Sequence, residues 1–190
     1  MMRIITGKAR GVRLETLEGE NTRPTAEKVK EAVFSAIQFD LQGRAVLDLF
    51  AGSGQMALEA MSRGAARAMF IDSSPEAMDI IKKNAKKTGF FDCSRFLISD
   101  FRNYLRKAAG KDKYDLIFID PPYSARCAAD AVERILAHSL ANDGCIIVVE
   151  SEEDNPLGDK AELLSHFEII KQKRYGRAFV TILVYKEDTQ

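Results

Sequence analysis

Apolar residues in this chain recur at two spacings, one typical of strands and the other of helices. From residue 44 onward, short apolar runs alternate with longer stretches in which apolar residues lie three and four positions apart. The runs predict strands over Ala45–Leu49, Ala68–Ile71, Arg95–Ser99, Leu116–Ile119, Cys145–Val149, Phe167–Lys173 and Ala178–Tyr185. The longer stretches predict one helix from the glycine loop to Arg63 and others over residues 75–88, 101–108, 126–139 and, more briefly, 159–165.

Turn residues separate these elements and indicate the fold class. Ser74-Pro75 is typical of a helix start, Gly89 of a helix end and Asn142-Asp143-Gly144 of a turn. Because strands alternate with helices, we expect an α/β fold with a doubly wound, Rossmann-like sheet that is mostly parallel and has helices on both faces. The last two strands, joined at Tyr175-Gly176, would form a C-terminal antiparallel hairpin. Ligands of such sheets bind at the carboxyl ends of the strands.

The first 24 residues follow a different pattern from the rest. Residues 2–22 alternate loosely between apolar and polar and contain three glycines, which predicts a small β-hairpin arm outside the large core. Thr25 resembles a helix N-cap, and apolar residues at helical spacing follow it to about Phe39. We therefore expect a basic N-terminal arm over residues 1–24 and a single Rossmann-like domain over residues 25–190.

Composition narrows the class of protein. The chain has 190 residues, of which 46% are hydrophobic and 29% charged, and this balance excludes wholesale disorder. No run reaches the roughly 20 apolar residues of a membrane span, and the N-terminus lacks the apolar segment of a signal peptide. Three cysteines without a CxxC motif and only two histidines indicate neither a disulfide framework nor a zinc site. We expect a cytoplasmic protein with no metal and no membrane partner.

Charge is balanced overall but uneven along the chain. The 28 basic and 28 acidic residues cancel, yet two segments carry only basic charge. Residues 1–13 contain Arg3, Lys8, Arg10 and Arg13. Residues 169–178 contain Lys171, Lys173, Arg174 and Arg177. These clusters are candidates for a phosphate-binding surface, although ordinary solvated strands and turns would account for them equally well.

The first strand of the parallel series ends in a glycine loop that begins with a carboxylate. Gly52-Ser53-Gly54 fits the loose dinucleotide-binding pattern, and Asp72 ends the next strand at about the distance expected for a ribose ligand. Asp48 would repel a pyrophosphate but would suit a ligand with an ammonium group, such as the methionine part of S-adenosylmethionine. The alternative is a plain glycine turn in which Asp48 caps the following helix.

A further acidic residue follows the third strand. Asp100 could accept a hydrogen bond from an adenine amino group, with Phe101 against the ring, or could serve as the N-cap of the helix that begins there. Glu150 ends the fifth strand and would face either a substrate or solvent. The three cysteines, Cys93, Cys127 and Cys145, are interpreted as small core residues.

The most specific motif is Asp120-Pro121-Pro122-Tyr123, directly after the continuously apolar fourth strand. Its two prolines stiffen the turn and remove two N–H donors, which leaves carbonyl groups free to accept hydrogen bonds. The exocyclic amine of a nucleobase is a poor nucleophile because its lone pair is delocalised into the ring. Hydrogen bonds from the amine to Asp120 and to the Pro121 carbonyl would localise that lone pair, and Tyr123 could stack on the base. The alternative is a rigid turn at a strand end.

Together these motifs resemble a known family. DLFAGSG at residues 48–54 with DPPY at residues 120–123 resembles class I S-adenosylmethionine-dependent amino-methyltransferases, and nearly the whole chain is similar to the RsmD family. That family methylates the N2 amine of one guanine in bacterial small-subunit (16S) ribosomal RNA. The narrower resemblance rests on residues 7–14, the RPT segment at 23–25 with Val29-Lys30-Glu31 and Phe34, the EAMSRGA helix at 59–65, and Arg174-Tyr175-Gly176.

The resemblance implies a class I methyltransferase fold and a role for each candidate residue. The cofactor, S-adenosylmethionine, would be bound by Asp48, Phe50, Gly52, Gly54, Asp72, Ser73, Asp100 and Phe101. The target guanine would be held by Asp120, Pro121, Pro122 and Tyr123. The partner, ribosomal RNA or an assembling small subunit, would be contacted by Arg3, Lys8, Arg10, Arg13 and Arg23. The chain departs from the family pattern at Gln55-Met56-Ala57, at Asp72 and, in the arm, at Thr6 and Val12.

Three other functions remain open from the sequence. A nicotinamide-dependent oxidoreductase would share the fold but is disfavoured by Asp48 and by the DPPY motif. An adenine-N6 methyltransferase acting on DNA or RNA would share that motif, although the short chain has no evident separate target-recognition domain. A non-catalytic RNA-binding protein with a retained methyltransferase fold is disfavoured because both site motifs are intact.

Overall fold

A computed structural model describes residues 2–17, 24–122, 127–158 and 160–186 of the chain. Its helices are α1 Pro24–Ala36, α2 Gln55–Ser62, α3 Pro75–Thr88, α4 Phe101–Ala108 and α5 Ala128–Ala137, with 3₁₀ turns at η1 Phe91–Cys93 and η3 Ala161–His166. Its strands are β1 Ala45–Asp48, β2 Arg67–Asp72, β3 Ser94–Ile98, β4 Tyr114–Ile119, β5 Ala141–Ser151, β6 Phe167–Tyr175 and β7 Ala178–Tyr185.

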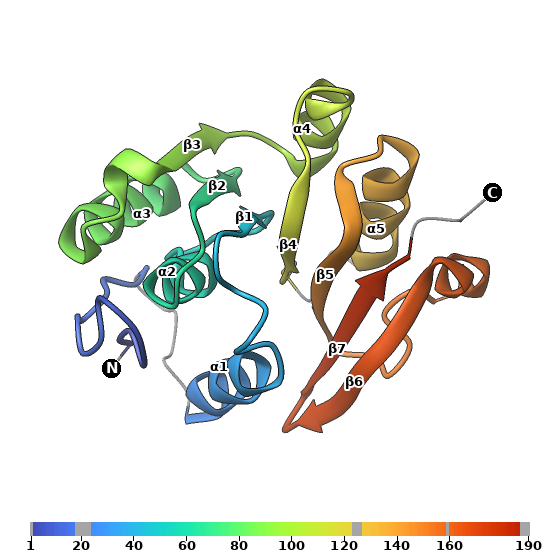
Figure 1. Ribbon diagram of the computed structural model, residues 1–190, viewed down its shortest axis with the longest axis horizontal. Coiled ribbons are helices and arrows are strands. Elements are labelled where there is room, and N and C mark those ends of the chain that lie inside the picture. Colours follow the sequence, from blue (N-terminus) through green and yellow to red (C-terminus); the bar gives the residue numbers. More distant parts are fainter. Residues whose placement is uncertain (1, 18–23, 123–126, 159, 187–190) are drawn as a thin grey trace.

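Within the described residues, the strands form one seven-stranded sheet in the order β3-β2-β1-β4-β5-β7-β6. Strands β1 to β5 are parallel, whereas β7 lies between β5 and β6 and is antiparallel to both. Helices α1, α2 and α3 lie on one side of this sheet, and α4 and α5 lie on the other (Figure 1). The predicted doubly wound α/β fold, mostly parallel with a C-terminal antiparallel hairpin, is therefore confirmed.

Alternating side chains along the strands divide the core into two layers. The face toward α1, α2 and α3 carries Val46, Phe70, Leu116, Phe118, Ile146 and Val148. The opposite face, toward α4 and α5, carries Leu47, Ile71, Ile117, Ile119, Ile147 and Val149. Because both faces are buried, these strands read as continuous apolar runs in the sequence. Side chains two positions apart share a face, so residues 48, 72, 120 and 150 continue the first face at the carboxyl ends of their strands.

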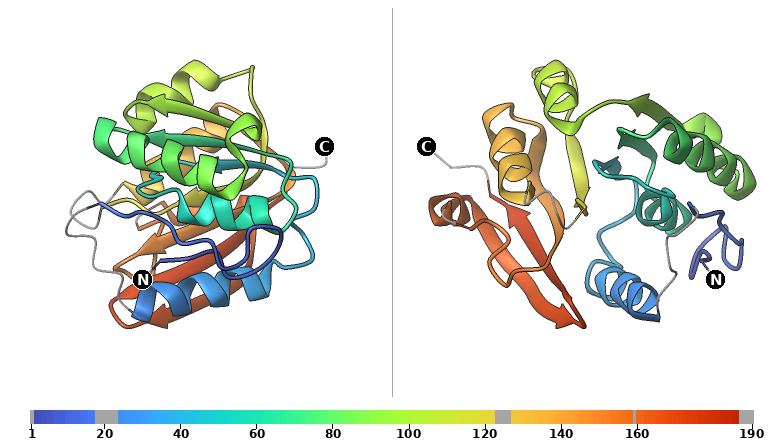
Figure 2. Two further views of the ribbon diagram at one scale, coloured as in Figure 1. Left: turned by 90° about the vertical axis from the view of Figure 1, so that its left-hand side faces the viewer. Right: turned by 180° about the vertical axis from the view of Figure 1, so that it is seen from behind.

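The N-terminal arm is docked along α2, as the views in Figures 1 and 2 show. The backbone amides of Ile5 and Thr6 donate hydrogen bonds to the Glu59 carboxylate at 2.7 and 3.0 Å. The amide of Lys8 donates to the Ser62 carbonyl at 2.8 Å. The arm also contributes three buried side chains to the core layer beneath α1 and α2, namely Ile4, Ala9 and Leu14. The expectation that the arm lies outside the large core is therefore wrong.

The two sides of the arm are joined less regularly than in the predicted hairpin. An isolated antiparallel bridge pairs Arg3 with Arg13. In the turn between them, the carbonyl of Gly7 accepts a hydrogen bond from the amide of Arg10 at 3.2 Å. Gly7 has φ +88°, and a Cβ atom there would lie 1.9 Å from the carbonyl oxygen of Ser62. Glycine is therefore required where the arm contacts α2. The division of the chain at residue 24 stays a prediction.

A buried ion cluster connects the arm, α1 and α2. The Glu59 carboxylate is fully buried, accepts a hydrogen bond from Arg63 Nε at 2.8 Å and lies 3.8 Å from the ammonium of Lys30. Lys30 is itself 2% exposed and donates to the carbonyl of Arg3 at 2.6 Å. Burial lowers the pKa of Lys30, and the nearby Glu59 charge opposes that shift. Two of the segments that carry the family resemblance, residues 29–31 and 59–65, thus hold the arm in place.

Replacing Glu59 by Gln should strongly destabilise the fold. The substitution would leave the Lys30 ammonium buried without its carboxylate, and removing one partner of a buried ion pair costs about 3–5 kcal/mol. Urea unfolding followed by circular dichroism measures this loss of unfolding free energy. The matched control is Glu31→Gln, an exposed position on α1, which should stay within about 0.5 kcal/mol of wild type. A loss for Glu59→Gln no larger than that of the control would contradict a stabilising role of the cluster.

Helix α1 has different ends from those predicted. It begins at Pro24 rather than after Thr25, because the fixed φ of proline suits the first helical position and its missing N–H is not needed there. It ends at Ala36 rather than near Phe39, and the side chain of Phe39 is 91% exposed. The apolar spacing alone could not reveal that this last aromatic residue turns away from the core.

Two later elements also differ from the prediction. The predicted turn at Asn142-Asp143-Gly144 lies inside β5, where the register with β4 shifts between Tyr114 and Leu116. The turn residues therefore form an irregularity within a strand instead of ending it. The short helix expected at 159–165 is the 3₁₀ turn η3.

The described part of the chain has no feature of a membrane span or a metal centre. No helix there combines the length and apolar character needed to cross a bilayer. No group of three or more His, Cys, Asp or Glu side chains in that part could hold a metal ion. Cys127 and Cys145 are buried, as expected, whereas Cys93 is exposed, which corrects its assignment to the core.

Candidate functional site

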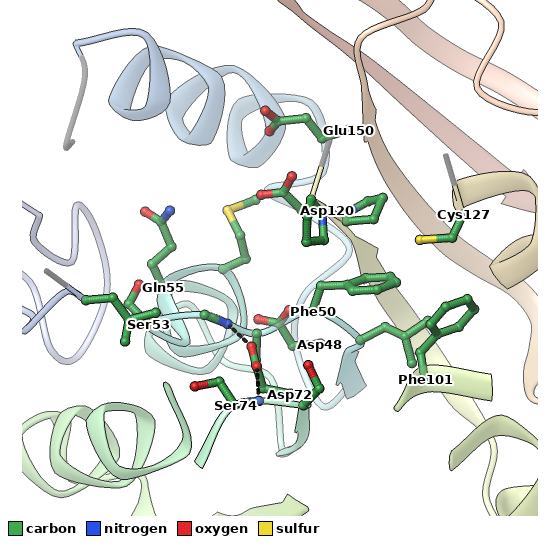
Figure 3. Close-up of a pocket in the computed structure, with 18 of the residues that line it drawn as sticks. Asp48, Phe50, Ser53, Gln55, Asp72, Ser74, Phe101, Asp120, Cys127 and Glu150 are labelled. Atoms are coloured by element: carbon green, nitrogen blue, oxygen red, sulfur yellow. Dashed lines mark hydrogen bonds between the residues drawn. The ribbon is translucent and has the colours of Figure 1, made fainter. Parts of the chain in front are cut away.

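A large pocket opens at the carboxyl ends of the parallel strands (Figure 3). Its volume is about 1240 Å³. Ligand pockets commonly enclose about 300–1,000 Å³, so this pocket is large enough for a nucleoside-sized cofactor and leaves further space beside it. The sequence-predicted cofactor residues that line it are Asp48, Phe50, Gly52, Asp72, Ser73, Asp100 and Phe101. The sequence-predicted catalytic residues that line it are Asp120, Pro121 and Pro122.

Four carboxylates enter this pocket from neighbouring strands. Asp48, Asp72, Asp120 and Glu150 lie at the end of, or directly after, strands β1, β2, β4 and β5. In the sheet, Asp48 is opposite Phe70 of β2 on one side and opposite Phe118 of β4 on the other. Asp72 and Asp120 each lie two residues further along their strands, about 7 Å further out. Asp48 is therefore the deepest carboxylate, with the others above it on either side.

Asp48 is a buried carboxylate that forms no ion pair with a Lys, Arg or His side chain of the described residues. Its side chain is 4% exposed, and Oδ2 accepts a hydrogen bond from the backbone amide of Ala57, in the first turn of α2, at 3.3 Å. Burial raises the pKa of Asp48 to about 7, the Ala57 amide opposes this shift, and the charge of Asp72 adds to it. A pyrophosphate would be repelled here. A ligand that carries an ammonium group fits, because it would stabilise the ionised carboxylate.

Asp72 fixes the glycine loop between β1 and α2. Its two oxygens accept hydrogen bonds from the backbone amides of Gly52 and Ser74, each at 2.8 Å, as the dashed lines in Figure 3 show. Each carboxylate oxygen can accept a second hydrogen bond, so ribose hydroxyl groups could still bind. Gly54 is not among the described residues that line the pocket. Its φ is +77°, and a Cβ atom there would lie 3.2 Å from two core side chains, so it serves the turn and its packing.

The start of α4 forms another wall of the pocket. Asp100 is the N-cap of this helix and accepts hydrogen bonds from the backbone amides of Arg102 and Asn103 at 2.9 and 3.4 Å. The capping alternative is therefore confirmed, and the exposed carboxylate still lines the pocket. Phe101 is 5% exposed and packs against Phe50 with ring centroids 5.1 Å apart. Most of the Phe101 ring thus belongs to the core, and little of it is available to a ligand.

The outer part of the pocket is formed by the turn after β4. Asp120 and Pro122 are exposed, whereas Pro121 between them is buried. Figure 3 shows Asp120 pointing into the pocket beside Glu150. Tyr123, predicted to stack on the substrate, lies outside the described residues.

The arm forms part of the pocket wall through apolar side chains. Met2 and Leu17 line the pocket, and the Ser53 hydroxyl donates a hydrogen bond to the sulfur of Met2 at 3.2 Å. The buried side-chain amide of Asn84 donates to the carbonyls of Ser53 and Glu15, each at 2.9 Å. The arm and the glycine loop are thereby joined, a link that no sequence motif indicated.

The predicted RNA-binding cations are not gathered at the pocket. Four of them are exposed, and none of these lines the pocket within the described part of the chain: Arg3, Lys8, Arg10 and Arg13. The fifth, Arg23, lies outside the described residues. The Lys8 amide contacts Ser62 at the last residue of α2, whereas Gln55, the first residue of α2, lines the pocket. An eight-residue helix separates these positions by about 10 Å.

A cation that was not assigned to the site does reach it. Arg177 is exposed and lines the pocket from the turn between β6 and β7, together with Tyr175 and Gly176. In the sequence, this contribution is indicated only by the segment 169–178, which carries basic but no acidic residues. Its position could not be read from the sequence, because it depends on the insertion of β7 between β5 and β6.

Comparison with known proteins identifies the family. The family model described as Conserved hypothetical protein 95 matches residues 2–184. The chain is 31% identical to the ribosomal RNA small subunit methyltransferase D of Haemophilus influenzae over 82% of this chain and 81% of that protein. It is 30% identical to the Escherichia coli protein of the same name over 82% and 77%. The chain belongs to the family that this model describes. The resemblance to the RsmD family is thereby confirmed.

Solved structures of similar sequence share the fold over nearly the full chain. The Escherichia coli protein yhhF superposes with a TM-score of 0.84 at 26% identity, covering 98% of this chain and 99% of that one. The Thermus thermophilus protein TTHA0928 superposes with a TM-score of 0.76 at 28% identity, covering 96% and 98%. The fold shared with these two proteins therefore extends over the arm and the C-terminal hairpin as well as the central sheet.

Proposed function

We propose that the protein transfers a methyl group from S-adenosylmethionine to the N2 amine of a guanine in small-subunit (16S) ribosomal RNA. Membership of the RsmD family supports ribosomal RNA methylation, since relatives in it are named ribosomal RNA small subunit methyltransferase D. The observation that carries the proposal is the buried Asp48 carboxylate at the bottom of a large pocket whose outer turn is Asp120-Pro121-Pro122. The partner would be free ribosomal RNA or an assembling small subunit, and the expected location is the cytoplasm.

The inner part of the pocket fits the cofactor. S-adenosylmethionine is the cofactor, and when bound it supplies an electrophilic methyl group on a positively charged sulfur. Asp48 would pair with the ammonium group of its methionine part. Asp72 would accept hydrogen bonds from the ribose hydroxyls through its remaining lone pairs, and Asp100 would accept one from the adenine amine.

The outer turn would activate the acceptor amine. Asp120 and the Pro121 carbonyl would each accept a hydrogen bond from the N2 amine, which directs its lone pair toward the methyl carbon. The nitrogen–carbon bond forms as the carbon–sulfur bond breaks, with inversion at carbon, and the sulfur keeps the bonding electron pair. The excess proton on nitrogen passes to Asp120 and then to water. Apolar walls favour this step because the positive charge on sulfur is lost during transfer.

A covalent route through cysteine is disfavoured. Methylation at a ring carbon of a pyrimidine proceeds through a thiolate adduct, and Cys127 is a described cysteine that lines the pocket. Burial raises the pKa of Cys127, so its thiol is poorly ionised and a weak nucleophile. Direct transfer to an exocyclic amine needs no such group.

The reaction is tested by transfer of label from methyl-labelled S-adenosylmethionine to unmodified small subunits and to naked 16S ribosomal RNA. Nucleoside analysis should find the label in N2-methylguanosine. Label in N6-methyladenosine would replace guanine by adenine as the acceptor. Absence of label, with cofactor binding detected by calorimetry, would favour a non-catalytic RNA-binding protein or a different acceptor. Binding of NAD(H) in place of S-adenosylmethionine would favour the oxidoreductase.

RNA binding should depend on the turn between β6 and β7. Arg177 lines the pocket, and the neighbouring Arg174 is exposed with its guanidinium 5.3 Å from the ring of Phe179. Each phosphate contact contributes about 0.7 to the slope of log K against log salt for a single strand, so the Arg174→Ala/Arg177→Ala variant should flatten this slope by about 1.4. Fluorescence anisotropy at several salt concentrations measures the slope.

The matched variant is Lys8→Ala/Arg10→Ala, which removes the same number of positive charges from the arm, near the end of α2 that lies away from the pocket. It tests the RNA-binding role proposed for the arm. If both variants flatten the slope, the RNA face extends from the hairpin to the arm. If only the arm variant does so, the hairpin arginines do not contact RNA. An unchanged slope in both would contradict a phosphate-binding role of either cluster.

A further inference from the structure

We infer that Glu150 selects guanine over adenine by accepting a hydrogen bond from N1–H of the target base, next to Asp120. The inference rests on the proposed function and names the residue that reads the base. Glu150 belongs to none of the motifs that carry the family resemblance, and the sequence left its orientation open between substrate and solvent.

Asp120 and Glu150 occupy equivalent positions on neighbouring strands. Strands β4 and β5 are parallel, with Ile119 opposite Val149. The next pair in this register is Asp120 and Glu150, and adjacent strands lie about 4.8 Å apart. Strand β5 continues beyond this point, where Glu150 pairs with Val180 of β7. The position of Glu150 is therefore set by the sheet rather than by a loop.

The two carboxylates face the same part of the pocket. Both continue the strand face of Phe118 and Val148, which packs toward α1, α2 and α3. Figure 3 shows the side chains of Asp120 and Glu150 next to each other, and Gln55 of α2 lines the same pocket. A flat base held by Asp120 would thus place its neighbouring ring atoms against Glu150.

The chemistry of the base edges decides which base this pair can accept. Guanine presents N1–H directly beside its N2 amine, so its edge offers a row of hydrogen-bond donors. Adenine and cytosine present a ring nitrogen with a lone pair beside their exocyclic amine. With Asp120 on the amine, Glu150 would meet a donor in guanine and a repelling lone pair in adenine or cytosine. A site built to hydrogen-bond one group can reject an analogue that lacks it by about 10⁴–10⁵-fold.

The same contact would also assist the reaction. A carboxylate that accepts the N1–H bond increases electron density on the guanine ring, and the adjacent N2 becomes a better nucleophile. Glu150 is therefore expected to affect the rate constant of transfer as well as the choice of base. Its effect on cofactor binding should be small, because the cofactor contacts lie around Asp48 and Asp72.

The test compares two RNA substrates, one with guanosine and one with 2-aminopurine at the methylated position found by nucleoside mapping. 2-Aminopurine keeps the amine but has a lone pair at N1. Wild-type enzyme should methylate it at least about 100-fold more slowly. Glu150→Gln should lose about 100-fold in kcat/KM on guanosine and little on 2-aminopurine, so that the ratio between the substrates collapses. The carboxamide of the variant can donate to the N1 lone pair.

Two further variants control for charge and for folding. Glu153→Gln removes an exposed carboxylate three residues further along the chain, at a position that does not line the pocket, and should keep the wild-type ratio. Glu150→Asp keeps the charge and should keep discrimination with a reduced rate. Tm and S-adenosylmethionine affinity, measured for each variant, separate loss of the hydrogen bond from loss of folding.

The outcomes distinguish this inference from the proposed function. If wild-type enzyme forms N2-methylguanosine and Glu150→Gln keeps the wild-type ratio, the role of Glu150 is overturned and the proposed function stands. Equal rates of wild-type enzyme on guanosine and 2-aminopurine would overturn it in the same way. If wild-type enzyme labels adenine instead, both fail.

Discussion

Replacing Asp120 by Asn should slow methyl transfer by a factor on the order of 10³ while S-adenosylmethionine binds as tightly as before. The carboxamide presents N–H groups toward an amine that itself needs acceptors, and it cannot take the proton that the amine releases. Cofactor binding should survive, since Asp120 lies two residues beyond the level of Asp48 and across β1 from Asp72. Single-turnover transfer at saturating cofactor measures the rate, and calorimetry measures the affinity.

The control for Asp120→Asn is Asp79→Asn, which removes one exposed carboxylate on α3 and should leave the rate within twofold, about 0.4 kcal/mol, of wild type. RNA affinity should be measured for both variants, because a loss of negative charge can strengthen phosphate binding. A fall in cofactor affinity as large as the fall in rate would mean that Asp120 acts by binding the cofactor. A rate close to wild type would remove Asp120 from the chemistry.

The central sheet could be predicted because its physics is local. Strands buried on both faces must be apolar along their whole length, and strands β1 to β4 are each followed by a helix with a clear apolar spacing. The arm could not be predicted in the same way. Its position depends on the Glu59 carboxylate, which holds amides more than 50 residues away in the sequence. A glutamate on a helix is ordinarily exposed to solvent, so local patterns predict an exposed Glu59, although it is buried.

The inner carboxylates of the site could also be predicted from the sequence. Parallel strands all present their carboxyl ends at one edge, so acids that end such strands must converge there. The hairpin arginine could not be placed, because the contribution of Arg177 follows from the order of β5, β7 and β6. The sequence predicts that the arm cations contact RNA but does not indicate how far they lie from the pocket. The structure separates Lys8 from the pocket by the length of α2.

Replacing Asp48 by Asn should weaken cofactor binding and stabilise the protein that has no cofactor bound. Losing one partner of a buried charge pair costs about 2–5 kcal/mol, so S-adenosylmethionine affinity should fall at least about 30-fold. Without a ligand, the pKa of Asp48 is about 7 in the folded protein against an ordinary value of 3.8. The folded state therefore binds the proton more tightly, and the free energy of unfolding falls by about 4 kcal/mol as pH rises from about 4 to above 7. Asp48→Asn lacks this loss, so urea unfolding at about pH 8 should find it more stable than wild type.

The pH dependence of binding tests the same carboxylate independently. Only ionised Asp48 attracts an ammonium group, so wild-type affinity should rise about tenfold per pH unit below 7 and then level off. It should fall again above about pH 8, where the α-amino group of the ligand loses its own proton. Asp48→Asn removes the carboxylate on which both limbs depend and should flatten both, whereas Asp79→Asn should keep both. An acid limb that persists in Asp48→Asn would assign the ammonium contact to another carboxylate. The burial that makes Asp48 unfavourable in the empty fold is thus what makes the pocket selective for a cation.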